Sequence, residues 1–377
     1  MMARRFSHFP LTFFGLILLF FPMTWNVLAF QNSFTEFVFL PIVQLFFPET
    51  DLTSDAKGLY VLVGILLGIS LIVHGFFLRM NAEKFNRTMS ILRTAAVFFL
   101  SAMLLKYGAD KLFKAQFYLP EPNLLYTPLG KLDKDILFWS TMGTSYEYNL
   151  FMGIMEIIPG LMILFSRTRK LGLIIATGVF LNVFAINLSF DISVKLLSFI
   201  LLMMSIYLVY PYLFNTKEND AETSYFSIKH KWINAVLLVV IFVESIGPYL
   251  LRGNFNDDHA SRPIMHGAYA VTDQNFTEGN SLFDFKIKRV FIHRDGYMIF
   301  QFENDEMVDF ALEIDPSGQI MTLTDYADSK QNLGYRYKRK TKVLELQNTN
   351  GTTIISTRAI PWRNLPALQR QFHWTVD

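Results

Sequence analysis

Long apolar blocks, separated by short polar segments, fill the chain up to about Leu250. A membrane-spanning helix needs roughly 20 mostly apolar residues, because the bilayer interior offers no water to exposed backbone groups. Seven blocks approach this length, and the pattern therefore predicts about seven transmembrane helices. Their ranges are 10–30, 58–79, 92–112, 148–166, 171–190, 194–214 and 232–251.

The pattern changes after Arg252, where charged, aromatic and β-branched residues intermix. From His266 onward, short alternating segments flank turn sequences such as Arg294-Asp295-Gly296 and Asp315-Pro316-Ser317-Gly318, which is the signature of β-hairpins. About eight strands in meander order predict an up-and-down barrel or curved sheet of lipocalin type. The fold class is thus an all-α membrane bundle over 1–252, followed by a β-rich domain over 253–377.

Lys and Arg residues are concentrated in alternate loops, which predicts the orientation. An odd number of spans with a cytoplasmic N-terminus places the β-rich domain outside. In a bacterium the chain is then a multi-pass protein of the inner membrane, with a periplasmic domain. The residues that indicate the inner side are Arg4, Arg5, Arg79, Lys84, Arg87, Arg93, Arg167, Arg169, Lys170, Lys217, Lys229 and Lys231.

Two outer segments are more than simple connections. The amphipathic stretch 35–47 is too short to span and fits the membrane interface. The longer stretch Lys114–Tyr148 contains three prolines and several aromatic residues. A segment of this kind is either a lid or docking element, or it packs over the bundle.

Composition narrows the possible chemistry. Charged residues make up 18% of the chain, its net charge is only +2, and no basic patch indicates nucleic acid as a partner. The chain has no cysteine, which excludes disulfides and thiolate metal sites. His74 is the one histidine well inside a predicted span, so we expect neither a haem site nor a metal site. The other histidines considered are scattered: His259, His266, His293 and His373.

Several motifs lie between Met103 and Phe214, within a core of about 92–214. They are Tyr107-Gly108-Ala109-Asp110-Lys111-Leu112-Phe113, Gln116-Phe117, Phe151-Met152-Gly153-Ile154-Met155-Glu156, Leu164-Phe165-Ser166-Arg167-Thr168-Arg169, Asn182-Val183, Asn187 and Asp191-Ile192-Ser193-Val194-Lys195-Leu196. These motifs resemble those of the DoxX-like family of bacterial membrane proteins. The tail end Phe372-His373-Trp374 also resembles that of the family's long members.

The resemblance implies a redox context. Some DoxX-type proteins are membrane subunits of thiosulfate:quinone oxidoreductases or of redox-stress complexes. By this resemblance the chain would be a membrane subunit that holds a quinone or another amphipathic ligand. Direct sulfur chemistry by this chain is not expected, because it has no cysteine.

Ionisable groups inside a span are costly and face a bundle interior, a partner or a cavity. Glu156 lies within 148–166, close to the helix-bending Pro159-Gly160. One reading makes Glu156 a proton relay or a ligand for a polar headgroup. The other pairs it with Lys106 or Lys111, so that it holds two helices together.

Four-residue spacings place other polar groups on shared helix faces. Asp191 and Lys195 have this spacing, and Asp191 could also cap the helix that follows. If the helices converge, the polar residues form one pocket in the outer half of the bundle. The candidate ligand-binding residues are Lys106, Tyr107, Asp110, Lys111, Glu156, Asn182, Asn187, Asp191 and Lys195.

Two other functions compete with the redox subunit. A non-catalytic envelope scaffold or assembly factor would bind a protein partner through its β-domain. An enzyme acting on lipid or peptide, like multi-span carboxylases with an outer β-domain, is an analogy of architecture alone. Membrane lipid is a partner under every reading.

The orientation is testable by labelling, because the chain has no cysteine. With N348C, we expect a membrane-impermeant maleimide to label intact cells whose outer membrane alone has been made leaky, since the positive charges place this hairpin outside. Labelling that required permeabilisation of the inner membrane would reverse the orientation.

Overall fold

The computed structural model describes residues 5–23, 25, 30–214, 231–275, 285–348, 352–370 and 374–375, without the side chains of 231, 233 and 234. Two compact units divide the chain. The helical unit contains Met1–Phe117 and Tyr146–Asp257, and the barrel unit contains Tyr118–Ser145 and Asp258–Asp377. The chain therefore leaves the helices once in its middle and once near its end. The predicted single domain boundary at 252/253 does not account for the segment Tyr118–Ser145, which belongs to the barrel unit.

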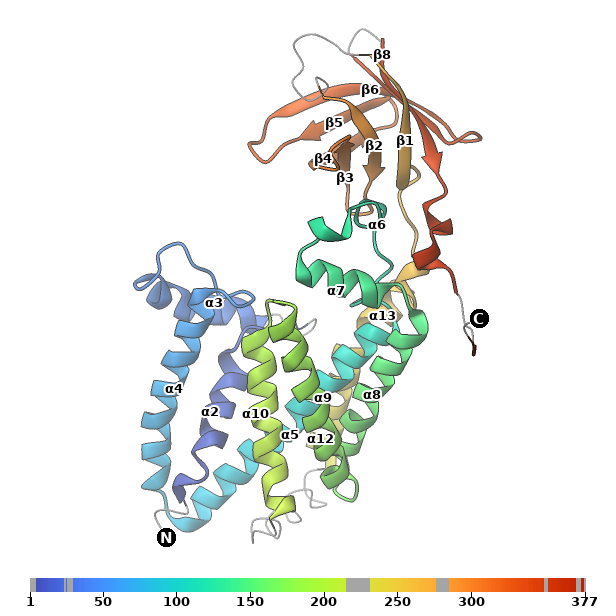
Figure 1. The fold of residues 1–377 in the computed structure, drawn as a ribbon. Helices are drawn as coiled ribbons and strands as arrows, with labels where there is room; N and C mark the ends of the chain where they lie inside the picture. The colour runs from blue at the N-terminus through green and yellow to red at the C-terminus, as the bar shows by residue number, and fades with distance from the viewer. Residues whose placement is uncertain are drawn as a thin grey trace. The chain divides into compact units, whose positions relative to one another are not determined.

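The helical unit is a bundle of apolar helices (Figure 1). Its helices are α2 (Phe9–Phe20), α3 (Phe30–Gln44), α4 (Lys57–Leu78), α5 (Ala82–Leu112), α8 (Tyr146–Leu164), α9 (Arg169–Ser189), α10 (Lys195–Leu213), α12 (Lys231–Ser245) and α13 (Gly247–Arg252). A 3-10 turn, Asp257–His259, follows along the chain.

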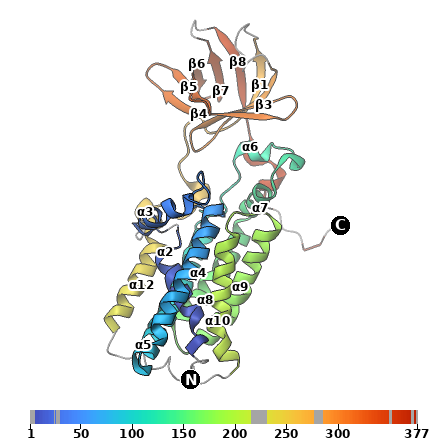
Figure 2. The ribbon, with the colours of Figure 1, turned by 90° about the vertical axis from the view of Figure 1, so that its left-hand side faces the viewer.

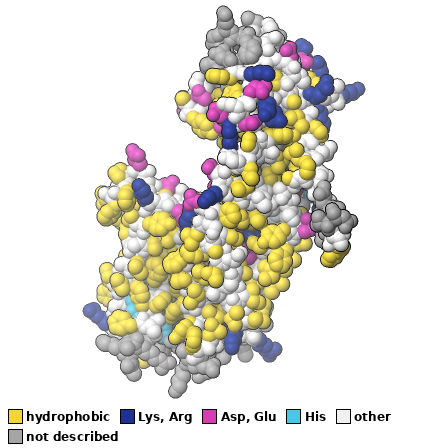
Figure 3. All heavy atoms as spheres, viewed as in Figure 1, with side chains coloured by type: hydrophobic (Ala, Val, Ile, Leu, Met, Phe, Trp, Pro, Cys, Tyr) yellow, Lys and Arg dark blue, Asp and Glu magenta, His cyan; other side chains and the backbone are white. Residues whose placement is uncertain are grey.

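Five of these helices, α4, α5, α8, α9 and α10, are long and apolar enough to cross a membrane. A sixth candidate is a broken span, Ala235–Ser245 with Gly247–His259, bent by 48° beside Pro248. These candidates coincide with the predicted spans after the first, and Figure 3 shows apolar side chains covering much of the outer surface of the helices.

The first predicted span differs from the structure. Helix α2 has only 12 residues and ends at Phe20, and Phe21 is extended. Pro22 explains this end, because a residue before proline is driven out of the helical region. A continuous helix over 10–30 is therefore wrong. The predicted short segment 35–47 falls largely on α3, a helix of 15 residues with Pro41 inside it.

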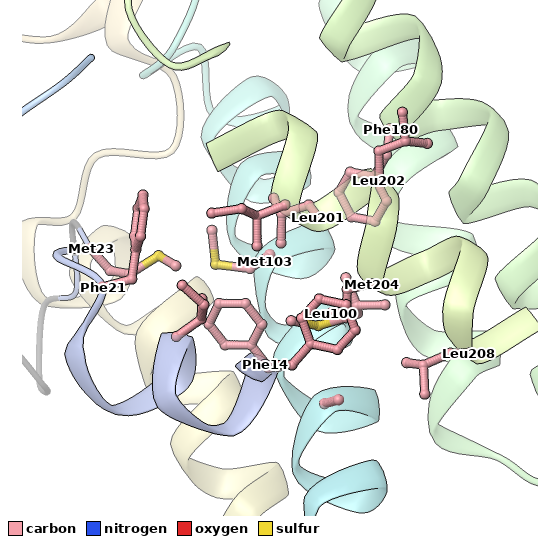
Figure 4. Close-up of a cluster of buried hydrophobic side chains, with 14 of the residues drawn as sticks. Phe14, Phe21, Met23, Leu100, Met103, Phe180, Leu201, Leu202, Met204 and Leu208 are labelled. Atoms are coloured by element: carbon pink, nitrogen blue, oxygen red, sulfur yellow. The ribbon is translucent and has the colours of Figure 1, made fainter. Parts of the chain in front are cut away.

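Helix α5 packs against α2, α8, α10 and α12, so it is the central helix of the unit. Its 31 residues include a long buried stretch from Ala96 to Leu104. In Figure 4, Leu100 and Met103 of α5 lie beside Phe14 of α2 and Met204 of α10. Apolar packing around α5 therefore joins helices from both ends of the helical sequence.

The barrel unit is an eight-stranded closed barrel, with every strand antiparallel to its neighbours in sequence and β1 paired with β8 (Figure 2). This confirms the predicted up-and-down barrel. Its elements are α6 (Pro122–Leu125), the 3-10 turn Leu129–Lys131, α7 (Lys134–Gly143), β1 (Gly267–Gln274), β2 (Ile287–Ile292), β3 (Tyr297–Phe302), β4 (Met307–Asp315), β5 (Ile320–Thr324), β6 (Lys330–Lys338), β7 (Val343–Gln347), β8 (Thr353–Ile360) and the 3-10 turns Trp362–Asn364 and Pro366–Leu368.

Apolar side chains fill the inside of the barrel. Val290 faces Tyr269 on β1 and Phe300 on β3, and all three are buried. Leu323 and Leu346 belong to the same cluster. The alternation of inward and outward residues along each strand produces this core, as the sequence pattern indicated. The interior is thus occupied by the protein's own side chains.

One outer face of the barrel is also covered. Ala268, Phe291 and Ile299 form a row across β1, β2 and β3, and all three are buried. The segment Tyr118–Ser145, here called the strap, covers this row with its Leu119, Leu125 and Tyr126. The cover is completed by Ile360 at the end of β8 and by Trp362, Leu365 and Leu368 after it. Among the roles considered for Lys114–Tyr148, that of a docking element fits this contact. The strap docks on the barrel.

A buried charge cluster fastens the strap. The Glu121 carboxylate lies 2.7 Å from Nε2 of His266 and 3.7 Å from Nε of Arg294. Burial alone would raise the pKa of Glu121, but the hydrogen bond with His266 and the nearby positive charges outweigh it, so this pKa is lowered. Burial lowers the pKa of His293. At the other end of the strap's first turn, Gln301 Nε2 donates to the carbonyl of Tyr126 at 3.0 Å.

Acidification is expected to loosen the strap. The lowered pKa of Glu121 means that its contribution is present above the ordinary carboxyl pKa and is lost as pH falls through the lower folded value. The lowered pKa of His293 acts in the same direction below pH 6.5, because the unfolded chain then binds the proton first. Hydrogen exchange of the strap amides, corrected for intrinsic rates, should accelerate from pH 7 to pH 4.

The same exchange measurement tests the cluster by mutation. Glu121→Gln leaves His266 and Arg294 without their carboxylate, and we expect about 3 kcal/mol less protection, or roughly 100-fold faster exchange at pH 7. Glu303→Gln is the matched control, because Glu303 pairs with Lys286 in an exposed ion pair. Equal exchange in the two variants would contradict the role of Glu121.

Candidate functional site

A buried ion pair joins α5 and α8. Nζ of Lys111 donates to Oε2 of Glu156 at 2.9 Å, and each side chain is only 5% exposed. The pair lies in a unit whose spans offer no water, so each charge depends on the other for its partner. Of the two readings of Glu156, the pairing with a lysine of α5 is therefore present in the structure.

Glycines explain why the two helices come this close. A Cβ atom added to Gly108 of α5 would lie 2.9 Å from the carbonyl oxygen of Gly153, and one added to Gly153 would lie 2.8 Å from that of Gly108. Small residues let the backbones of membrane helices approach each other directly. Lys111 and Glu156 each follow their glycine by three residues, so they lie near the crossing.

Two further charges lie on α5 beside this pair. Nζ of Lys106 donates to Oδ2 of Asp110 at 3.0 Å, as the four-residue spacing predicted. The Tyr249 hydroxyl of α13 donates to the other oxygen of Asp110. Tyr249 was not expected in the site, because no motif or spacing links it to a helix 139 residues away. Its position next to Phe113, with ring centroids 4.5 Å apart, depends on packing alone.

The ring of Tyr107 lies near both ammonium groups. Nζ of Lys106 is 5.4 Å from its centroid and Nζ of Lys111 is 5.8 Å away. Lys111 also lies 5.7 Å from the ring of Phe117. Aromatic faces stabilise cations at these distances. The result, here called the polar network, consists of Lys106, Tyr107, Asp110, Lys111, Glu156 and Tyr249.

The polar network can donate hydrogen bonds to an oxygen acceptor and can exchange protons between ammonium, carboxylate and phenol groups. Two lysines and two carboxylates balance each other in charge, so a neutral ligand with carbonyl or hydroxyl groups suits it better than an ion. Within the described part of the chain, no group of three or more His, Asp or Glu residues could hold a metal ion.

The remaining predicted residues form a second group or stand apart. Asn187 donates to Oγ of Ser198 at 3.0 Å, and Lys195 contacts Asp191 at 2.8 Å as its spacing predicted. These contacts are made to other residues than Glu156, and the single pocket for all the candidates stays a prediction. The second group instead connects α9 to the start of α10.

The predicted helix cap at Asp191 is wrong. The carboxylate of Asp55 accepts from the backbone N–H groups of Lys195 at 2.8 Å and Leu196 at 3.1 Å. Asp191 is instead in the left-handed region, with φ +54°, and its side chain is 82% exposed. Asp55 was missed because it lies in the turn before α4, 140 residues from Lys195, and the cap forms only when the helices pack.

Asn182 lies outside both groups. Its side chain is exposed on α9, and among the described residues it has no hydrogen-bond partner. His74 has a structural role, because its ring contacts the Thr12 hydroxyl at 2.9 Å and the carbonyl of Arg5 at 3.2 Å. Of the terminal Phe372-His373-Trp374 motif, the first two residues lie outside the described residues.

The fold and the polar network define a class of protein: a bundle with five candidate membrane spans and a buried charge network, carrying a closed β-barrel. The chain belongs to the family of the Bacillus subtilis (strain 168) protein "Uncharacterized protein YwoB", to which it is 34% identical over 112 residues, 30% of this chain and 71% of that protein. No family model matches the chain, and no solved structure matches it.

The buried ion pair predicts compensation between its partners. Lys111→Met or Glu156→Met alone strands one charge, and we expect each to lower the free energy of unfolding by about 3 kcal/mol. The double variant, which leaves no charge unpaired, should recover at least half of that loss. Denaturant titration in detergent micelles measures it, with Lys84→Met on an exposed part of α5 as control. A double variant as unstable as the sum of the singles would contradict the pairing.

Proposed function

We propose that the protein is a membrane subunit of a redox-type complex and that its polar network holds a quinone or another amphipathic ligand. The observation that carries the proposal is the Tyr107 ring beside two buried lysines, with their Nζ atoms 5.4 and 5.8 Å from its centroid. The carboxylate partners of these lysines come from α5 and α8. The resemblance of the Tyr107–Phe113 and Phe151–Glu156 motifs to DoxX-like proteins supplies the redox context.

The chemistry of the polar network suits a quinone headgroup. Carbonyl oxygens accept hydrogen bonds from an ammonium or phenol group, and an aromatic face such as that of Tyr107 stacks on a flat ring. Reduction of a quinone takes up protons. The hydrogen-bonded pairs Glu156–Lys111 and Asp110–Tyr249 contain groups that can supply protons. The apolar tail of such a ligand would lie among the apolar side chains of the spans.

The proposed location is the inner membrane of a bacterium. Seven crossings require α2 to cross the membrane together with the five candidate spans and the broken span. With a cytoplasmic N-terminus, the barrel unit would then lie in the periplasm. The ligand would then enter the polar network from the lipid phase, because α5 and α8 are both candidate spans.

A second candidate function, an envelope scaffold or assembly factor, is favoured by one feature of the barrel. The interior of the barrel is occupied by its own apolar side chains, so a partner would bind the exposed outer surface of the strands. Lys338, Arg339, Lys340 and Lys342 are exposed in the hairpin between β6 and β7, where they would meet an acidic partner.

Native mass spectrometry of the protein, gently extracted from its own membrane, tests the first candidate. We expect a quinone-like lipid near stoichiometric level. Lys106→Met should lose most of it, Glu156→Gln should abolish its retention, and Tyr249→Phe should reduce it. Lys84→Met, the same substitution on an exposed part of the same helix, should retain it.

Two results would decide against the proposal. Retention unchanged in Lys106→Met and Glu156→Gln would remove the ligand from the polar network. A co-purifying envelope protein with no lipid ligand would favour the scaffold instead. Circular dichroism of each variant separates loss of the ligand from loss of the fold.

A further inference from the structure

The Asn182 amide is exposed in the middle part of a candidate membrane span. Helix α9 runs for 21 residues from Arg169 to Ser189, so Asn182 lies seven residues before its nearer end. At a rise of 1.5 Å per residue this is about 10 Å, which is too far for a short amide side chain to reach the interface.

An amide cannot remain unpaired against hydrocarbon without a large cost. Among the described residues, no hydrogen-bond partner contacts the Asn182 side chain. The opposite face of α9, with Leu173, Ala176 and Phe180, is the face that packs in the core of the bundle. A partner for the Asn182 amide therefore has to come from beyond the described part of this bundle.

We propose that Asn182 meets Asn182 of a second copy of this chain, so that two α9 helices form a homodimer contact within the membrane. A carboxamide carries both a donor and an acceptor, so two amides related by a two-fold axis satisfy each other with a pair of hydrogen bonds. No other uncharged side chain of the exposed face has this self-complementarity on a rigid, mid-span position.

The surroundings of Asn182 permit such an approach. Gly178 and Ala185, one turn before and after it, are exposed and small, and a Cβ added to Gly178 would meet nothing within 4 Å. Two helices can therefore come close enough for short side chains to meet. Leu181 and Leu188, 56% and 55% exposed, flank the contact and would pack across it.

Cysteine cross-linking in native membranes tests the contact, because the chain has no cysteine of its own. We expect A185C to form a disulfide adduct of twice 43.7 kDa under mild oxidation. I72C is the matched control: Ile72 is 63% exposed on α4, and chance collisions would cross-link it equally.

The Asn182 amide itself is tested on that background. N182L/A185C should form about fivefold less adduct than A185C, and N182Q/A185C, which keeps an amide, should form an intermediate amount. Since the Asn182 side chain is exposed and has no hydrogen-bond partner among the described residues, these variants should keep the fold, which circular dichroism checks. Equal adduct with Leu at 182, equal adduct in I72C, or an adduct whose mass includes another protein would each overturn the homodimer.

Discussion

The structure of the helical unit depends on one constraint: a polar group carried into hydrocarbon must find its partner inside the protein. The crossing of α5 and α8 meets this constraint at Gly108 and Gly153, where the two backbones touch. Only such a close crossing brings the carboxylate of the short Glu156 side chain to the ammonium group of Lys111. The same helix end then holds Asp110 between Lys106 and the α13 hydroxyl. The charge network is thus a consequence of how closely two helices approach.

The barrel follows a different rule, because its polar backbone groups are satisfied strand to strand around a closed ring. With its interior filled, it has one apolar outer face, across β1, β2 and β3. The strap and the residues after β8 cover that face. A buried carboxylate, Glu121, sets the register of the strap on the barrel, since apolar contact alone would tolerate sliding.

Local periodicity explains what the sequence could predict. The later spans and the order of the strands could be predicted because each depends on a run of adjacent residues. Contacts at four-residue spacing, such as that of Lys106 with Asp110, could be predicted for the same reason. Contacts made by distant segments were not predictable. Tyr249 and Asp55 carry no local signal for their partners. Asn182 was misplaced for a related reason, because a sequence shows that a residue is in a helix but not which way the packed helix is rotated.

The chain passes between the units three times, and two of these segments, after α5 and after α13, are joined to each other in both units. In the helical unit, the end of α5 and α13 are joined by the contact of Tyr249 with Asp110 and by the Asp257 N–H, which donates to the carbonyl of Phe113 at 3.1 Å. In the barrel unit, the continuations of the same two segments are joined by Glu121 and His266.

Each segment thus carries one member of each clamp, within a short distance along the chain. Each clamp lies inside one unit: Asp110 with Tyr249 in the helical unit, and Glu121 with His266 in the barrel unit. Loss of one clamp therefore leaves the contacts of the other in place.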